Sequence, residues 1–437
     1  MGAFPIAEEV VLKLRKQLGI STLAQASIRQ IVQLADGLQD YCGEGFIRTE
    51  MGVPGLPAAP VGVTAQVAAL HEGVASVYPP IQGVPTLKEE LSRFARLFMN
   101  LELPARGCIP TVGAMHASLL AFMVANRRDP AKDTTLFIDP GFPVQKRQLG
   151  VLGMKYAHFD IYDYRGDRLR ARLEEFLQQG HIGTFLYSNP NNPAWICLTD
   201  KELEIIGELA TKYDVVVLED LAYFGMDFRE DFGRPGVPPF VSSVARYTDN
   251  YVLLFSASKI FSYAGERLGA VLISDALFDR EFTGLSSHFL STRFGPALLQ
   301  EALYATTAGA SHSAQRGVAA VLKAVNDGVY DFTGALQPYG ERARQMKQLF
   351  LKHGFHLVYD QDEGRSLADG FYFTVAHKGM TGEQLLAELL RFGISAITLD
   401  TTGSSRTEGL RICVSHTRSE RMAVLEERLR LFAAAHA

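Results

Sequence analysis

The stretch SASKIFSYAGERLG (256–269) follows the apolar run YVLLF (251–255) and contains a lysine, Lys259, and an arginine, Arg267. An apolar run of this length, ended by polar residues, is consistent with a buried strand. A lysine at the end of a buried strand is costly unless its charge or its amine is used. The commoner alternative is a surface lysine just past the strand, and this stretch alone leaves both interpretations open.

Short apolar segments of the same kind alternate with helical patterns between about residues 85 and 310. The segments are TTLFIDP (134–140), MKYAHFD (154–160), GTFLYSNP (183–190), VVVLED (215–220), YVLLFSAS (251–258) and LGAVLIS (268–274). Near-continuous apolar runs suit strands buried on both faces of a parallel or mixed sheet that is covered by helices. The pattern predicts an α/β fold, in which ligands bind beyond the carboxyl ends of the strands.

The flanking parts of the chain differ from this alternating region. Residues 7–42 have a helical pattern with short breaks, and a Gly/Pro-rich loop follows at 51–63. After about residue 311, a long helical stretch leads into FYFTVAH (371–377), a helix near 381–392, ISAITLD (394–400), LRICVSH (410–416) and a C-terminal helix. We expect a large domain at 65–315 and a small α+β domain made of 1–64 and 316–437. The small domain includes an N-terminal helical arm, to which the sequence assigns no function.

Composition narrows the class of protein. The 437-residue chain has a net charge of −5, without the basic field that is typical of nucleic-acid or anionic-membrane binding. Its four cysteines form no CxxC pattern and its histidines no HExxH-like pair, so we expect neither a metal site nor a disulfide framework. Acidic residues interrupt the N-terminus before any signal-peptide core, and no apolar run approaches the length of a membrane span. We expect a cytoplasmic protein.

Polar residues follow several of the predicted strands at the point where each ends. VVVLED ends in Asp220, with Tyr223 close behind, YVLLFSAS runs into Lys259, and GTFLYS runs into the cluster that contains Asn192. Each has an ordinary explanation, since Asp often caps a helix and Asn/Pro clusters are usually turns. Their coincidence at one edge of the sheet favours a functional site.

Seven segments occur in a characteristic order: YPPIQGVPTLKEEL, VGAMHAS, DPGFP, SNPNNP, VLEDLAYFGMDF, SASKIFSYAGERLG and GLRICVSH. The series, which spans about residues 50–416, resembles the fold-type-I enzymes that use pyridoxal 5′-phosphate (PLP). Within these it resembles the aspartate-aminotransferase-like class I/II group. The resemblance implies the PLP-transferase fold type I, with a mixed, mostly parallel sheet between helices in a large PLP-binding domain.

The resemblance assigns the covalent attachment of PLP to Lys259 and the partner of its pyridine nitrogen to Asp220. Lys259 matches the lysine that holds PLP as a Schiff base and moves the proton at the substrate α-carbon; a desolvated, cation-rich site suits this role because it lowers the pKa of the amine. Asp220 matches the carboxylate beside the pyridine nitrogen. Glu219 is the competitor, but adjacent side chains of a strand face opposite ways. Tyr223 and Asn192 match the two donors to the PLP phenolate oxygen.

Further residues match those that hold the ring and the phosphate. Phe142 matches the aromatic residue that stacks on the PLP ring. The family's phosphate site corresponds to Gly113, Ala114, Met115, Ser256, Ser258 and Arg267. A helix start offers free N–H groups and a positive dipole end to an anion. Met115 stands where many relatives have a hydroxyl residue. Tyr78 matches the tyrosine that reaches the neighbouring subunit's phosphate, which implies a homodimer with shared active sites; the alternative is a surface aromatic.

Arg411 matches the arginine that grips the substrate α-carboxylate, and its alternative is a structural salt bridge. Gly52 matches the loop glycine that closes over the same carboxylate, and the resemblance assigns Asn192 to the substrate site as well as to the cofactor site. One departure is NPNNPAW in place of the usual NPNNPTG, so the turn at Trp195 must take another conformation, with the tryptophan in the core rather than at the pocket rim. Arg293 can belong to a phosphate site, a substrate site or a salt bridge.

These assignments predict a homodimeric PLP-dependent aminotransferase that moves an amino group from an amino acid to a 2-oxo acid. The first alternative is another PLP reaction on the same scaffold, such as β-elimination at a C–S bond or decarboxylation. The second is a PLP-sensing regulatory module. Against it, the N-terminal segment is short and has no convincing helix-turn-helix with a basic recognition helix. The side chain of the preferred amino acid is not specified by these motifs.

Overall fold

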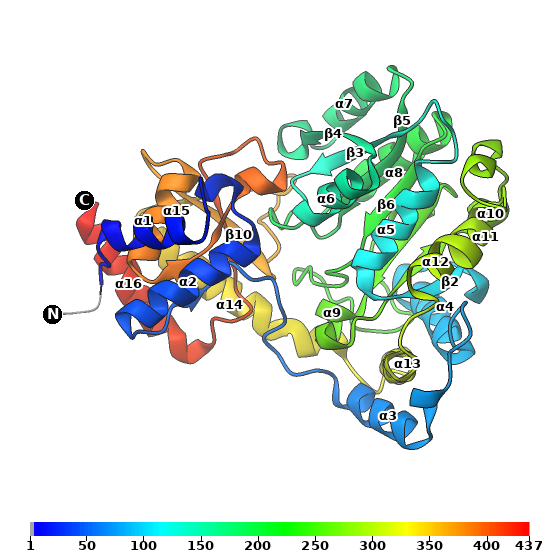
Figure 1. Ribbon diagram of the computed structural model, residues 1–437, viewed down its shortest axis with the longest axis horizontal. Coiled ribbons are helices and arrows are strands. Elements are labelled where there is room, and N and C mark those ends of the chain that lie inside the picture. Colours follow the sequence, from blue (N-terminus) through cyan, green and yellow to red (C-terminus); the bar gives the residue numbers. More distant parts are fainter. Residues whose placement is uncertain (1–3, 437) are drawn as a thin grey trace.

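The computed structural model describes residues 4–436 and has two bodies, which lie side by side in Figure 1. The right-hand body contains the central sheet, and the left-hand body contains the first and last helices of the chain. Within the described residues, no helix has the length and apolar character needed to cross a membrane.

The right-hand body is built on a seven-stranded sheet with strand order β2-β8-β7-β6-β5-β3-β4. The strands are β2 (Cys108–Thr111), β3 (Thr134–Asp139), β4 (Lys155–Asp160), β5 (Ile182–Ser188), β6 (Val216–Asp220), β7 (Tyr251–Ser256) and β8 (Gly269–Ile273). Strand β8 runs antiparallel to both its neighbours, and the other pairs are parallel. The sheet is therefore mixed and mostly parallel, as predicted.

Helices cover both faces of this sheet. The helices of this body are α3 (Pro60–His71), α4 (Pro85–Met99), α5 (Gly113–Ala125), α6 (Pro143–Leu152), α7 (Arg168–Leu177), α8 (Asp200–Lys212), α9 (Ala257–Ile260), α10 (Asp275–Asp279), α11 (Phe294–Pro296), the π-helical η8 (Ala297–Leu303), α12 (Tyr304–Thr307) and α13 (His312–Asn326). Adjacent strand residues pack on opposite sides: Val217 and Leu253 belong to one apolar core, and Leu218 and Leu254 to the other. Burial on both faces explains the continuous apolar runs of these strands.

The edge strands differ from the sequence prediction. Strand β2 was not predicted because it has only four residues and contains Pro110, which a sheet accommodates at its edge. Strand β4 was predicted to be buried on both faces, and this is wrong: Lys155, Tyr156 and His158 are exposed because β4 forms the opposite edge of the sheet.

The left-hand body combines two small sheets with the terminal helices. Its strands are β1 (Ile47–Arg48), β9 (Phe355–Leu357), β10 (Tyr372–His377), β11 (Ile394–Ser395), β12 (Ile397–Thr398) and β13 (Leu410–Cys413). Strands β12-β13-β10-β9 form an antiparallel sheet, and β1 pairs with β11. Its helices are α1 (Glu8–Gln17), α2 (Ile28–Cys42), α14 (Phe332–Lys352), α15 (Gly382–Arg391) and α16 (Met422–Ala435). The predicted strand at 394–400 is thus split, and β1 and β9 were not predicted.

The N-terminal segment contributes to both bodies. Helix α2 begins with a capping box between Ser27 and Gln30 and ends at Gly43, whose φ of 71° closes the helix in the left-handed region. Helix α1 packs against α15. Helix α3 lies against α13 in the right-hand body. The domain boundaries at 64/65 and 315/316 stay a prediction.

Candidate active site

A pocket of about 560 Å³ opens where the two bodies meet. Its wall on the side of the large sheet comes from the carboxyl ends of β5, β6 and β7 and from the beginnings of α5 and α6. The other wall comes from α2, residues 51–53, β10 and β13. The volume is in the range of sites for small molecules, and the position is the one that parallel α/β sheets use for ligands.

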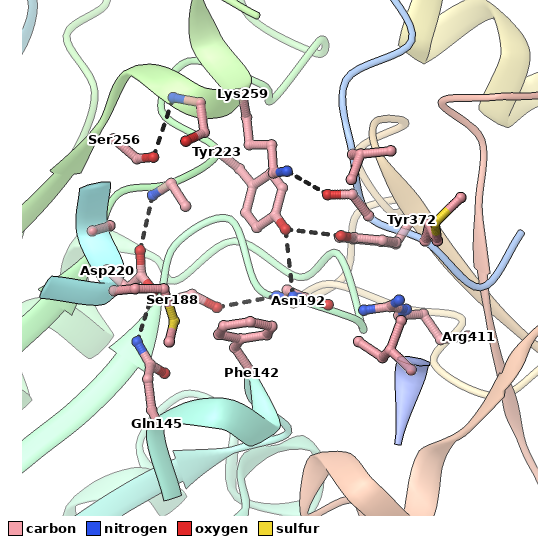
Figure 2. Close-up of a pocket in the computed structure, with 18 of the residues that line it drawn as sticks. Phe142, Gln145, Ser188, Asn192, Asp220, Tyr223, Ser256, Lys259, Tyr372 and Arg411 are labelled. Atoms are coloured by element: carbon pink, nitrogen blue, oxygen red, sulfur yellow. Dashed lines mark hydrogen bonds between the residues drawn. The ribbon is translucent and has the colours of Figure 1, made fainter. Parts of the chain in front are cut away.

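Lys259 projects into this pocket and does not lie on the open surface (Figure 2). It belongs to α9, which begins directly after β7, where Ser256 Oγ accepts a hydrogen bond of 3.3 Å from the Ser258 backbone N–H. Lys259 Nζ donates to the carbonyl oxygen of Gly52. Burial lowers the pKa of the Lys259 amine to about 8, and the nearby cations of Arg411 and Arg267 act in the same direction. The amine is therefore more easily deprotonated than an exposed lysine, and its neutral form becomes the major one above pH about 8.

Asp220 lies across the pocket floor, at the end of β6. Its Oδ2 accepts a 2.9 Å hydrogen bond from Gln145 Nε2, and its Oδ1 accepts one of 3.0 Å from the Ala222 N–H. Burial raises the pKa of Asp220 to about 6, while these two donors oppose the shift. Glu219 points to the other face of the sheet, where it accepts hydrogen bonds from Ser243 and from the Val244 backbone. Strand geometry thus directs only Asp220 into the pocket.

Three polar side chains in the pocket form a hydrogen-bonded series. Asn192 Nδ2 donates to Tyr223 Oη at 3.4 Å, and Tyr223 Oη lies 2.9 Å from Tyr372 Oη (Figure 2). The Asn192 backbone N–H is fixed by Ser188 Oγ at 3.1 Å. Phe142, the N-cap of α6, also lines the pocket. The sequence did not identify Tyr372, because a tyrosine within the apolar segment at 371–377 is not distinguished from the other buried residues of a strand.

The beginning of α5 and the loop after β7 form a cationic cradle. Ala114, Met115, Ser256, Ser258 and Arg267 line the pocket together. Gly113 has a φ of 72°, and a Cβ there would lie 2.5 Å from Arg267 Nη2, so the helix start and the guanidinium are in close approach. The cradle has the donor set that a phosphate needs: free helix N–H groups, hydroxyls and a guanidinium.

Arg411 lies on β13 with only 1% of its surface exposed. Its Nη2 donates to the carbonyl oxygen of Glu50 at 2.6 Å, and its Cζ lies 4.5 Å from the ring centroid of Tyr372. Its Nε has no hydrogen-bond partner in the described part of the chain. No carboxylate of residues 4–436 forms a salt bridge with it, so the salt-bridge interpretation is wrong. A buried guanidinium with free donors beside a pocket suits a bidentate anion.

Gly52 is required by the packing at the same end of the pocket. A Cβ at position 52 would lie 1.8 Å from Tyr372 Oη, so any side chain there would displace the tyrosine or the loop. The carbonyl of Gly52 accepts from Lys259. The loop therefore closes over the lysine as well as over the region of Arg411.

The remaining singled-out residues lie away from the pocket lining. Tyr78 is 90% exposed on the surface. Arg293 lies on the surface, 3.8 Å from Asp279. Trp195 is fully buried, as predicted, and its ring packs 5.2 Å from that of Tyr223. Trp195 has a φ of 57°, which is in the left-handed region that favours glycine. The turn therefore keeps a glycine-like backbone at the position where the usual motif has glycine.

Comparison with known proteins adds to this geometry. Residues 54–429 match the family described as Aminotransferase class I and II. The chain belongs to the class I and II aminotransferase family. This confirms the predicted family, and with it the expectation of a PLP-dependent aminotransferase as the class of enzyme.

Individual relatives of this family are distant. The chain is 25% identical over 288 residues to an aspartate aminotransferase of Pyrococcus horikoshii, covering 65% of this chain and 66% of the relative. It is 24% identical over 292 residues to the aspartate aminotransferase of Bacillus subtilis, covering 64% and 68%. A double mutant of the Thermus thermophilus aspartate aminotransferase superposes with a TM-score of 0.76 at 16% identity, covering 93% and 96%. The alignments to the first curated relatives span only about two thirds of their length, and the structural match confirms the fold.

One wall of the pocket in this aminotransferase-family chain was missed by sequence reasoning. Ile28, Arg29, Val32 and Gln33 of α2 line the pocket beside the predicted Gly52. No sequence signal indicates this contact, since α2 has the pattern of any amphipathic helix and only the tertiary fold brings it to the site. Gln145, which holds Asp220, was missed for the same reason.

Proposed function

We propose that Lys259 holds PLP in this pocket and that the enzyme transfers the α-amino group of an amino acid to a 2-oxo acid. The observation that carries the proposal is the pairing, in one pocket, of a lysine whose pKa is lowered to about 8 with a buried arginine that has no carboxylate partner among residues 4–436. The Lys259 amine can react with a carbonyl group, and the Arg411 guanidinium can bind a carboxylate.

The residues of the pocket fit PLP. Asp220 offers a buried carboxylate for the pyridine nitrogen, Tyr223 and Asn192 offer polar hydrogens, and the cradle at α5 and Arg267 offers donors for a phosphate. When bound, PLP supplies an electron sink for the bond that breaks at the substrate α-carbon. Arg411 would hold the substrate α-carboxylate and thereby fix which bond faces Lys259.

Lys259 is proposed to move the proton. In its neutral form, Nζ can accept the proton from the substrate α-carbon, and the low pKa keeps a large share of the amine neutral near pH 8. Asp220 is ionised above pH about 6 and so can balance a positive charge at the pocket floor. The residues 51–53 loop, which touches Lys259 through Gly52, would exclude water from this step.

The α2 wall supports a proposal for the substrate side chain. Ile28 and Val32 face the pocket with Met51 and Val53, so this wall is mostly apolar. Arg29 and Gln33 of the same helix are exposed at the pocket mouth. We propose that the preferred amino donor has an apolar side chain that packs against α2.

We also propose that the enzyme is a homodimer and that it is located in the cytoplasm. Tyr78 is 90% exposed, and one face of α3 presents exposed apolar side chains at Val63, Val67 and Leu70. A patch of this kind is typical of a protein interface. A second copy of the chain would cover it and would bring Tyr78 to a neighbouring site.

The function is tested by giving the PLP-loaded protein an amino acid without any oxo acid. A transaminase loses the visible absorbance of its bound cofactor after one turnover and releases one equivalent of oxo acid. A C–S lyase or another ammonia-releasing lyase keeps the absorbance and releases ammonia continuously, while a decarboxylase releases CO₂. Either lyase result would refute the proposal.

A further inference from the structure

Tyr372 makes contact with three of the proposed site residues at once. It lies on β10, opposite Cys413 of β13, and is 2% exposed. Its hydroxyl is 2.9 Å from that of Tyr223, and it abuts the Cα of Gly52. The guanidinium of Arg411 lies 4.5 Å from its ring centroid (Figure 2). One side chain therefore links the proposed donor to the cofactor with the proposed carboxylate-binding residue.

The direction of the hydrogen bond between the two tyrosines decides what Tyr223 can offer the pocket. A phenol carries one proton and accepts two hydrogen bonds. Tyr223 Oη already accepts from Asn192 Nδ2 at 3.4 Å. When Tyr372 donates to it as well, the proton of Tyr223 is left for the pocket. Within residues 4–436, the hydroxyl of Tyr372 contacts no acceptor other than Tyr223.

The charges around the pair favour the same direction. Burial raises the pKa of Tyr372 to about 12, and the cation of Arg411 limits the shift. Burial also raises the pKa of Tyr223 well above its ordinary value. The cation of Arg411, 4.5 Å from the ring centroid of Tyr372, favours donation by the Tyr372 hydroxyl.

We propose that Tyr372 is a positioning residue whose hydroxyl and ring have different roles. Its hydroxyl donates to Tyr223 and so frees the Tyr223 proton for the cofactor, and its ring seats the guanidinium of Arg411. The inference rests on the proposed function, because it takes Tyr223 as a donor to PLP and Arg411 as the substrate arginine.

Two variants separate the parts. Tyr372→Phe keeps the ring and removes the donor, so we expect kcat to fall about 2- to 12-fold while KM for the amino acid stays within about twofold. The pH at which the visible absorbance of bound PLP changes should rise, since a donor to the phenolate lowers it. Tyr372→Leu removes the ring too, so KM should rise by a further factor of about 2 to 30.

A double-mutant cycle distinguishes this role from a merely structural one. Because the hydroxyl of Tyr372 is proposed to act through Tyr223, Tyr372→Phe should change neither kcat nor the pH midpoint in a Tyr223→Phe background. Tyr359→Phe is the matched control: Tyr359 is also a buried tyrosine, but its hydroxyl bonds Asp160 at 2.7 Å, outside the pocket lining. It should leave kcat, KM and the pH midpoint at wild-type values.

The apoprotein provides a readout that does not depend on turnover. Trp195 is the only tryptophan, and its ring lies 5.9 Å from that of Tyr372. Its emission and thermal transition should match wild type in Tyr372→Phe, which excludes misfolding. A Tyr372→Phe enzyme with wild-type kcat and pH midpoint, or one whose losses add to those of Tyr223→Phe, would overturn the inference alone. A wild type that fails to bind PLP would overturn the proposed function and this inference with it.

Discussion

At the scale of single residues, Lys259 carries the chemistry because its surroundings change its acidity. Burial lowers its pKa from 10.5 to about 8, and Arg411 and Arg267 add to the shift. The unfolded chain therefore binds more protons at this site than the folded chain between pH 8 and 10.5. The stability contributed by this group rises with pH across that window.

The first prediction concerns the pH dependence of cofactor capture. Only the neutral amine attacks an aldehyde, so the rate at which the apoprotein captures PLP should rise with pH and level off above a midpoint near 8. Stopped-flow absorbance of apoprotein mixed with PLP measures this. A midpoint near the ordinary value of 10.5 would show that the lysine is not desolvated.

The second prediction concerns Arg411. Loss of its charged hydrogen bonds should lower kcat/KM for the amino acid by roughly ten- to more than a hundredfold in Arg411→Ala, with PLP still bound. Arg293→Ala is the matched control, since Arg293 is a surface arginine near Asp279. Arg411→Ala with wild-type kcat/KM would remove Arg411 from the substrate site.

At the scale of elements, α2 forms the wall of the pocket that faces the substrate side chain. Val32→Glu places a carboxylate on this apolar wall, so kcat/KM for apolar donors should fall about tenfold or more, while PLP affinity is kept. Tyr41→Glu introduces the same residue at an exposed position of α2 outside the pocket lining and should have no such effect. A donor panel measured on both variants tests the assignment, and equal changes in both would refute it.

The elements also show how far the sequence specifies the structure. Of the six predicted strands of the large sheet, five are buried along their whole length, which leaves a continuous apolar run in the sequence, and the sixth, β4, is an edge strand with exposed residues. Strand β2 was missed because a four-residue edge strand containing Pro110 has no such signal. Lys259, Asp220 and Arg411 were found because each is a polar residue in an apolar context. Tyr372 and Val32 have no such contrast, and only the packing of β10 and α2 reveals them.

At the scale of the whole molecule, the proposed dimer shares residues between its two sites. A hybrid of a Lys259→Ala subunit with a Tyr78→Ala subunit would contain one site in which both residues are intact. Mixing and reassembling the two inactive variants should restore about a quarter of wild-type activity, because about half of random dimers are hybrids with one intact site. Activity no greater than the sum of the separate variants would show that Tyr78 acts within its own subunit or not at all.

The central claim is that Lys259 forms the covalent link to PLP, and borohydride reduction tests it most directly. Reduction fixes the cofactor to the amine that holds it, and mass spectrometry of a peptide digest then identifies the labelled lysine. We expect one phosphopyridoxyl group per chain, on the peptide that contains Lys259, and none in Lys259→Ala, which should also lack the visible absorbance of the bound cofactor. A label on another lysine, or a wild-type protein that takes up no label, would contradict the account.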